Sequence, residues 1–251
     1  MIEIRDLTFS YHKENVLNSI DLTIEDGKLT AIMGENGSGK TTLIKNLLGS
    51  LSPKMGNILI DGDDIGDLND KKRSSLFSYI PQSIDGVFNF YAMDVVLFGL
   101  AGELGLIKTP GKEELIRADQ AFDRLGINHL KYRKLSEISG GERQMILIAR
   151  SLVRDTPYII MDEPTSSLDY RNQLNVMEIA KNLSKDGKTV ILSTHNPSFA
   201  LFYTDNTIIL KDGMIYKSGK SSEVINEENL SFVFDRDINF ATVDGKKIIY
   251  P

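Results

Sequence analysis

The chain has 251 residues, enough for a full hydrophobic core, and its 41% hydrophobic and 25% charged residues are ordinary for a soluble globular protein. It contains no cysteine, which excludes disulfides and thiolate metal sites. The formal net charge of −6, without a basic block, argues against nucleic acid as the main partner.

Neither the first residues nor the apolar segments indicate a membrane-embedded protein. Residues 1–6 are charged from the start, unlike a signal peptide. The most apolar segment, residues 91–107, is interrupted by Asp94 and Glu103 and is too short to cross a bilayer. We therefore expect any role at a membrane to depend on a partner protein.

The first elements are strands. Apolar and polar residues alternate over residues 2–11 and again over residues 16–24, which is typical of half-buried antiparallel strands. Asp26 and Gly27 predict a turn after the second strand. Residues 29–33 then form a short apolar run of strand length.

Directly after this run comes a glycine-rich stretch, residues 34–42, which fits the pattern G-x-x-x-x-G-K-[ST] and leads into a helix predicted over residues 43–48. Glycines let successive backbone N–H groups converge on a phosphate, and the helix N-terminus adds partial positive charge. Lys40 is placed to reach the β- and γ-phosphates, and the Thr41 hydroxyl to bind Mg²⁺. The alternative, a plain glycine turn, does not explain the whole pattern. The nucleotide-binding residues expected here are Gly34, Asn36, Gly37, Ser38, Gly39, Lys40, Thr41 and Thr42.

The remaining elements alternate between strands and helices. Short strands are expected at residues 56–62, 77–80, 158–161 and 189–193, and a hairpin at 207–216 around the turn 211–213. Helical spacing predicts helices over residues 112–125, 140–154 and 171–183. On the first of these, Leu115, Ala118, Phe122 and Leu125 share one face. From Ser221 the tail looks helical and then extended.

This order of elements predicts an α/β fold with a parallel, three-layer core, because strands alternate with helices after the glycine-rich stretch. The alternating strands near the N-terminus form an antiparallel side sheet. Residues 84–155 read as a helical insertion, which divides the single domain into a core (1–83 and 156–251) and a helical subdomain.

Two carboxylates, Asp162 and Glu163, follow the apolar strand 158–161. Nucleotides bind at the carboxyl ends of parallel strands, so Asp162 is placed to hold Mg²⁺ and Glu163 to act on an attacking water as general base. The alternative is a solvated acidic turn after a strand.

Ser139, Gly140, Gly141 and Glu142 open a predicted helix. The spacing of Ser139 and Glu142 is that of a capping box, which is the simplest explanation. It does not explain two glycines in the first turn, each of which costs about 1 kcal/mol relative to alanine in a helix. We therefore predict a second anion-binding helix N-terminus.

Taken together, these motifs resemble those of the ATP-binding-cassette (ABC) ATPases, a family of P-loop NTPases, over nearly the whole chain. Residues 138–142 are similar to the family signature LSGGQ, with isoleucine for leucine and glutamate for glutamine. The resemblance implies a head-to-tail dimer in which the glycine-rich stretch of one copy and Ser139, Gly140 and Gly141 of the other enclose each ATP with its Mg²⁺.

Four further positions match the family. The resemblance implies that Gln82 senses Mg²⁺ and the attacking water, that His195 contacts the γ-phosphate, that residues 167–169 cross the dimer interface and that Tyr11 stacks on adenine. Each position has an alternative interpretation. Gln82 would be an exposed loop glutamine, and His195 a polar residue before a helix starting at Pro197. Residues 167–169 would form a helix N-cap, and Tyr11 would be a core tyrosine at a strand end.

Within the family, residues 94–99 are similar to the DVVLLGR run of importers for iron-siderophores, haem and cobalamin, although Leu100 stands where arginine is usual. The same subfamily is indicated by residues 140–144, 147–150, 155–157 and 244–251. Related zinc and manganese importers share much of this pattern. The resemblance implies an ATP-hydrolysing subunit that powers import through a separate membrane permease, with an external substrate-binding protein.

Such a subunit is peripheral, on the cytoplasmic face of the membrane. Three alternatives stay open at this point. The first is a non-transport family member acting on a soluble partner, such as an iron–sulfur assembly ATPase. The second is a module that uses ATP only as a dimer switch, and the third is an exporter with separate subunits.

Overall fold

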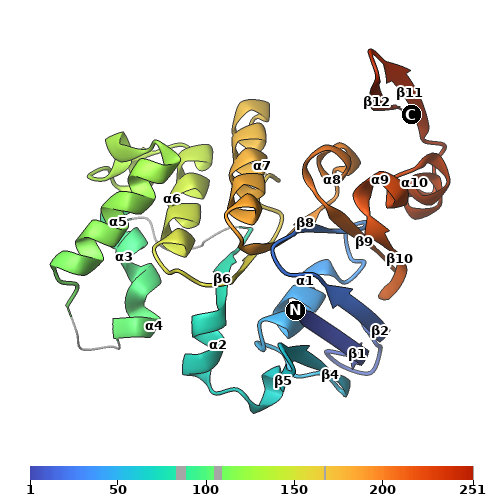
Figure 1. Cartoon of the computed structure of the whole chain (residues 1–251), viewed down its shortest axis with the longest axis horizontal. Helices are drawn as coiled ribbons and strands as arrows, with labels where there is room; N and C mark the ends of the chain where they lie inside the picture. Colours follow the sequence, from blue (N-terminus) through green and yellow to red (C-terminus); the bar gives the residue numbers. More distant parts are fainter. Residues whose placement is uncertain (83–88, 105–108, 167, 251) are drawn as a thin grey trace. The chain divides into compact units, whose positions relative to one another are not determined.

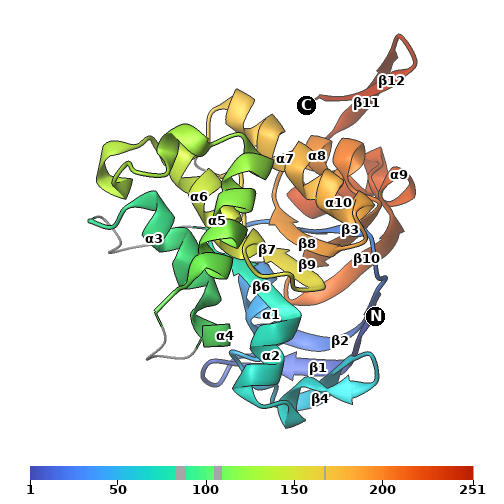
Figure 2. The ribbon, with the colours of Figure 1, turned by 60° about the vertical axis from the view of Figure 1, so that its left-hand side comes forward.

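The computed structural model describes residues 1–82, 89–104, 109–166 and 168–250. Its contacts divide the chain into two compact units, which are described one after the other (Figures 1 and 2). The first unit comprises residues 1–68 and 180–251, and the second comprises residues 69–179. Among the described residues, no helix is both long and apolar enough for a membrane crossing.

The first unit contains an antiparallel sheet with the strand order β2-β1-β4-β5. Its strands are β1 (Ile2–Phe9), β2 (Leu17–Ile24), β4 (Met55–Ile60) and β5 (Asp63–Asp64). Ile4 lies opposite Leu22 on one side and Ile58 on the other. All three side chains are buried, which confirms the antiparallel, half-buried strands predicted from the alternation.

Parallel strands form the centre of the first unit, in the order β10-β9-β3-β8. They are β3 (Leu29–Met33), β8 (Thr189–Thr194), β9 (Asn206–Lys211) and the antiparallel edge strand β10 (Met214–Lys220). Every residue of β3 and β8 is buried, as expected for strands inside a parallel sheet. The predicted hairpin over residues 207–216 is confirmed as β9 and β10.

The helices of this unit follow the strands. They are α1 (Lys40–Leu47), the 3₁₀ turn η1 (Ile65–Asp67), α8 (Pro197–Tyr203), α9 (Ser221–Val224) and α10 (Glu227–Phe234). Helix α1 begins three residues earlier than predicted, because Gly39 is its N-cap. The tail ends in a hairpin of β11 (Asn239–Val243) and β12 (Lys246–Tyr250), which extends beyond α10 in Figures 1 and 2.

The second unit joins a short parallel strand pair to a group of helices. The strands are β6 (Phe77–Ile80) and β7 (Tyr158–Met161), with Ile80 opposite Met161. The α-helices are α2 (Asp70–Leu76), α3 (Ala92–Leu97), α4 (Ala101–Leu104), α5 (Lys112–Leu125), α6 (Gly140–Leu152) and α7 (Tyr170–Lys185), whose last residues belong to the first unit. Short 3₁₀ turns occur at η2 (Phe98–Leu100), η3 (Asn128–Leu130) and η4 (Leu135–Glu137).

Helices α5 and α6 match the predicted spans closely, but the buried face of α5 differs from the prediction. Ala118 and Phe122 are buried as expected, whereas Leu115 is 42% exposed. Leu115 lies in the first turn of the helix, and Ala121 continues the buried face instead.

Candidate functional site

The glycine-rich stretch, here called the phosphate loop (residues 34–42), connects β3 to α1 in the first unit. Gly39 caps α1 at a φ of 106°, a left-handed conformation that side chains rarely adopt. Gly34 lies so close to β9 that an added Cβ would overlap the carbonyl of Leu210. These two glycines are therefore required by the backbone path, which keeps the loop amides clear of side chains.

Lys40 and Thr41 stand where the loop becomes a helix. Lys40 is only 6% exposed, and its Nζ donates to the carbonyls of Gly34 and Glu35, both at 2.9 Å. Thr41 is exposed, so its hydroxyl is open to a ligand. The loop thus holds a buried ammonium group and an accessible hydroxyl side by side.

Tyr11 lies just beyond β1 and is 50% exposed, so it is not the buried core tyrosine of the alternative interpretation. Its hydroxyl is 3.5 Å from Oγ1 of Thr42, and its ring packs edge-on against Phe9 at a centroid distance of 4.9 Å. The structure therefore places an accessible aromatic ring next to the end of the phosphate loop, as a base-stacking role requires.

His195 leaves the strand next to the phosphate loop. The register of β3 and β8 pairs Met33 with Thr194, so the loop and His195 follow neighbouring parallel strands at the same edge. His195 is exposed, and the next residue, Asn196, caps α8 by accepting the backbone N–H of Ser198 at 3.0 Å. The first unit thus brings its predicted site residues together at one strand edge.

The second unit repeats this arrangement with different side chains. The backbone N–H of Asp162 donates to the carbonyl of Ile80 at 2.9 Å, which aligns the ends of β6 and β7. Gln82 and Glu163 therefore follow neighbouring strand ends, and Nε2 of Gln82 lies 3.3 Å from Oε2 of Glu163. Glu163 has a φ of 44°, a conformation that costs a non-glycine residue free energy and is frequent at functional sites.

Two neighbours of these carboxylates were missed by the sequence reasoning. Ser166 donates its hydroxyl to the carbonyl of Glu163 at 3.1 Å and lies 3.3 Å from Nε2 of Gln82. Burial and a hydrogen bond to Asp162, which is 3% exposed, raise the pKa of the Tyr79 phenol to about 12. The contacts of Ser166 with Gln82 and of Tyr79 with Asp162 depend on strand register, for which the sequence carries no local signal.

Ser139 is the N-cap of α6, and the capping box is confirmed. Oε2 of Glu142 accepts from the backbone N–H and from the hydroxyl of Ser139, both at 2.8 Å. These bonds from the Ser139 backbone and then from its side chain hold the pKa of Glu142 below its usual value. The hydroxyl of Ser139 is thus engaged with the glutamate that replaces the family's glutamine.

The two signature glycines have different surroundings. A Cβ on Gly141 would lie 2.5 Å from Nδ2 of Asn172, whereas a Cβ on Gly140 would meet nothing within 4 Å. Gly140 lines a cavity of about 230 Å³ together with Gln82 and Glu163. The structure therefore explains Gly141 by packing inside the chain, but not Gly140.

The segment 167–169 lies partly outside the described residues, because Ser167 is not among them. Asp169 does cap α7, accepting the backbone N–H of Asn172 at 2.9 Å. The predicted N-cap is thus confirmed, and the interface role of this segment stays a prediction.

The donors expected for Mg²⁺ are all oxygen atoms, the class that this ion prefers. They are the exposed hydroxyl of Thr41, the buried carboxylate of Asp162 and the amide oxygen of Gln82, whose nitrogen faces Glu163. Across the described ranges, no three His, Cys, Asp or Glu side chains gather into a metal site of their own. Taken one by one, these donors are of the type that suits an ion that also binds phosphate oxygens and water.

A glycine loop leading into a helix, with carboxylates at the end of a parallel strand, defines the class of P-loop nucleotide-binding proteins. Residues 17–166, more than half of the chain, match the ABC transporter family, and the chain belongs to this family. It is an ATP-binding subunit with the ABC ATPase fold.

Curated relatives and solved structures agree with this assignment. The chain is 33% identical to an iron chelatin transport ATP-binding protein of Helicobacter pylori, over 100% of this chain and 99% of the relative. It is 34% identical to the manganese transport ATP-binding protein MntB of Bacillus subtilis, over 95% and 94% of the two chains.

Two solved structures are informative. An inward-facing metal-chelate type ABC transporter has a TM-score of 0.87 at 28% identity, covering 99% of this chain and 95% of that chain. A dimeric ATP-binding cassette bound to ADP and phosphate has a TM-score of 0.77 at 28% identity, covering 88% and 99%. Structures of this family therefore include both the transporter-bound and the dimeric cassette.

Proposed function

We propose that this protein hydrolyses ATP, with Glu163 as the general base. The single observation that carries the proposal is the pairing of Glu163, in its left-handed conformation, with Gln82 at 3.3 Å at the end of a parallel strand. A carboxylate held in a conformation that costs free energy is oriented by its surroundings, as a base must be. Gln82 orients the attacking water against it.

The other residues bind and stabilise charge. The phosphate loop amides and Lys40 hold the β- and γ-phosphates, Tyr11 stacks on adenine, and His195 contacts the γ-phosphate. Thr41, Gln82 and Asp162 hold Mg²⁺, which neutralises phosphate charge when bound. Catalysis then rests mainly on positioning and charge stabilisation rather than on covalent chemistry.

We propose that two copies pair head to tail, with Ser139 to Gly141 of one copy against the phosphate loop of the other. The open surroundings of Gly140 support this pairing, because nothing within the chain requires glycine there. The dimeric cassette among the similar structures supports it as well.

The partner at the membrane is an integral permease, contacted by the surface around Gln82 and by the helical subdomain, residues 84–155, inserted into the core 1–83 and 156–251. The protein is then peripheral, on the cytoplasmic face, and acts indirectly with a substrate-binding protein. The metal-chelate type transporter among the similar structures supports this arrangement.

For the cargo we propose a metal chelate of the iron-siderophore, haem or cobalamin type. The iron chelatin relative and the metal-chelate type structure support this class. The manganese relative supports a zinc or manganese importer as the second candidate. Transport assays with permease and binding protein, comparing an iron chelate with free manganese, distinguish the two.

The test of the proposed reaction is Glu163→Gln, which keeps the size of the side chain and removes the base. We expect ATP binding to be retained, phosphate release to fall by a factor of about 100 or more, and an ATP-bound dimer to accumulate. Phosphate release and light scattering measure these effects. Turnover like that of the wild type would show that Glu163 is not the base. A wild type that binds ATP without releasing phosphate would favour the dimer-switch alternative.

A further inference from the structure

The turn between β9 and β10 lies directly against the phosphate loop. The backbone N–H of Gly213 in this turn donates to the carbonyl of Ser38 at 3.2 Å. The carbonyl of Leu210 occupies the space where a Cβ of Gly34 would lie. The path of the loop is therefore constrained at two points, its start and its middle, by residues that belong to no nucleotide-binding motif.

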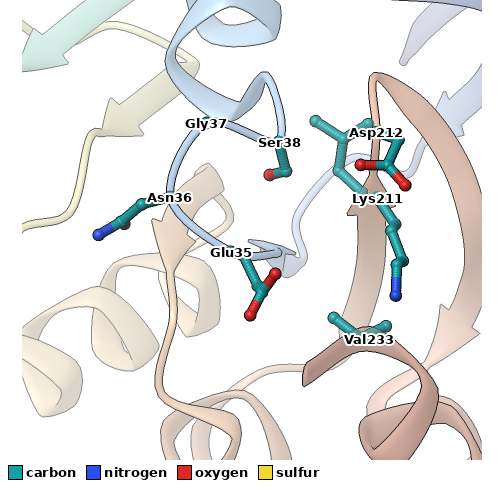
Figure 3. Close-up of a pocket in the computed structure, with 8 residues that line it drawn as sticks. Glu35, Asn36, Gly37, Ser38, Lys211, Asp212 and Val233 are labelled. Carbon is teal, nitrogen blue, oxygen red and sulfur yellow. The ribbon is translucent and has the colours of Figure 1, made fainter. Parts of the chain in front are cut away.

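Helix α10 lies next to this turn and the loop. A cavity of about 150 Å³ is lined by residues 35–38 of the loop, by residues 210–212 and by Val233 of α10 (Figure 3). Figure 3 shows the side chains of Lys211 and Val233 on the side of the cavity opposite the loop. Val233 is fully buried, so α10 is packed firmly in place.

Lys211 connects the turn to α10. Its Nζ donates to the carbonyl of Phe232 at 2.5 Å and pairs with Asp235 at 2.9 Å. It also lies 4.4 Å from the centroid of the Phe232 ring, which stacks on Tyr216 of β10 at 4.5 Å. The Phe232 carbonyl belongs to the last turn of α10, where carbonyls lack partners within the helix and a cation is favoured by the helix dipole.

The side chain of Lys211 is only 18% exposed, whereas that of Asp235 is 75% exposed. An exposed ion pair contributes little, so the bond to the helix carbonyl and the contact with the ring are the main interactions of Lys211. Gly213, only two residues after Lys211, donates its backbone N–H to Ser38 of the phosphate loop, so the fixed position of Lys211 constrains the loop.

We propose that Lys211 is a positioning residue for nucleotide binding, which fixes the β9–β10 turn to α10 and thereby holds the phosphate loop in its binding conformation. The inference rests on the binding of ATP at that loop. Backbone amides bind phosphate well only when they already converge, because ordering the loop at the moment of binding reduces affinity.

The competing interpretation is that Lys211 only stabilises the end of α10. The two differ in what happens to folded protein that lacks the ammonium group. A purely structural role lowers the melting temperature but leaves the ATP affinity of the folded protein unchanged. A positioning role also weakens ATP binding and loosens the loop itself.

The test uses the full chain with Lys211→Met, Lys211→Arg and the matched control Lys217→Met, which removes an exposed lysine from the same hairpin. We expect Lys211→Met to weaken MgATP binding by about tenfold, Lys211→Arg to remain within about twofold of the wild type, and Lys217→Met to change nothing. Titration calorimetry at a temperature well below each melting point measures the affinities.

Hydrogen exchange provides the second measurement. In Lys211→Met without nucleotide, we expect faster exchange in residues 34–39 as well as in α10, and unchanged exchange in α6. Wild-type ATP affinity in Lys211→Met, or faster exchange in α10 alone, would overturn the proposal. If Lys211→Met does not fold, the milder Phe232→Leu, which removes the ring contact of Lys211, must weaken MgATP binding by about twofold, and unchanged affinity there would equally overturn the proposal. Neither result bears on transport, so a failure of the proposed import function leaves this test intact.

Discussion

The two units place polar residues at the same kind of position, the carboxyl edge of paired parallel strands. They differ in the interactions that hold these residues in place. In the first unit, glycines and backbone bonds fix the phosphate loop, and the buried ammonium of Lys40 already bridges two loop carbonyls. In the second unit, the exposed amide of Gln82 and the left-handed Glu163 meet across one 3.3 Å contact.

This difference indicates which part of the proposed reaction, nucleotide binding or hydrolysis, each unit suits. Backbone amides that converge in a fixed loop suit a charge that is always present, such as phosphate. Side chains that meet through a contact between an exposed amide and a carboxylate can reorient when a metal ion and water arrive. This contrast supports the proposal that the first unit serves mainly binding and the second serves the chemical step.

The largest loss of ATP affinity is expected from Lys40→Met in the first unit. Removing a buried charge that is proposed to contact phosphate should weaken ATP binding by about 100-fold, because truncating a buried charged partner costs several kcal/mol. Lys45→Met, an exposed lysine on the same helix, is the matched control and should bind as the wild type does. Equilibrium binding of a fluorescent ATP analogue measures both. Equal affinity of the two variants would contradict the assignment of the loop.

Substituting the signature glycines is expected to have an intermediate effect on ATP hydrolysis. Gly140→Ala should raise the free energy of unfolding by about 0.5–1 kcal/mol, because alanine is the better helix former and its Cβ meets nothing. The same variant should lower ATP hydrolysis by about tenfold or more if a second copy approaches that surface. Urea unfolding and phosphate release measure the two quantities. A more stable variant with full activity would count against the head-to-tail dimer.

Gly141→Ala is the informative comparison for this prediction. Its Cβ would lie 2.5 Å from Nδ2 of Asn172, so we expect it to destabilise the monomer as well as to lower activity. The two variants together separate packing inside the chain from contact with another copy.

Most of the binding half could be predicted from the sequence, because its chemistry resides in a contiguous backbone motif. The strand over residues 29–33 and the loop after it are fixed by local rules, and both are confirmed. Helix α2 was missed because none of its residues is buried, which leaves no apolar periodicity to detect.

The catalytic half was less accessible to prediction, for a physical reason. The carboxylates Asp162 and Glu163 follow from a strand ending, but the contact of Asp162 with Tyr79 and that of Ser166 with Gln82 depend on strand register and loop path. The position of Lys211 against α10 is likewise set by packing between segments that are distant in sequence. Such contacts are tertiary, so no local pattern specifies them.

The smallest effect, a change in the free energy of unfolding, is expected from substituting Glu142 in the second unit. Near neutral pH, Glu142→Gln should lower the free energy of unfolding by less than about 1 kcal/mol, because the carboxylate is partly exposed and screened. Since bonds from Ser139 lower the pKa of Glu142, this stabilisation is present in full above the ordinary carboxyl pKa of 4.5 and is lost as the pH falls through the lowered value.

The difference between wild type and Glu142→Gln should therefore vanish in acid, which urea unfolding over a pH series detects. Glu137→Gln is the comparison variant, since Glu137 accepts a longer bond of 3.4 Å from the backbone N–H of Lys134 and pairs with the exposed Arg133 at 3.5 Å. A difference that stays constant with pH would mean that Glu142 does not hold Ser139 through its charge. A difference that vanishes would mean that the charge of Glu142 holds Ser139, and in the proposed dimer Ser139 must then break this bond in order to donate to phosphate.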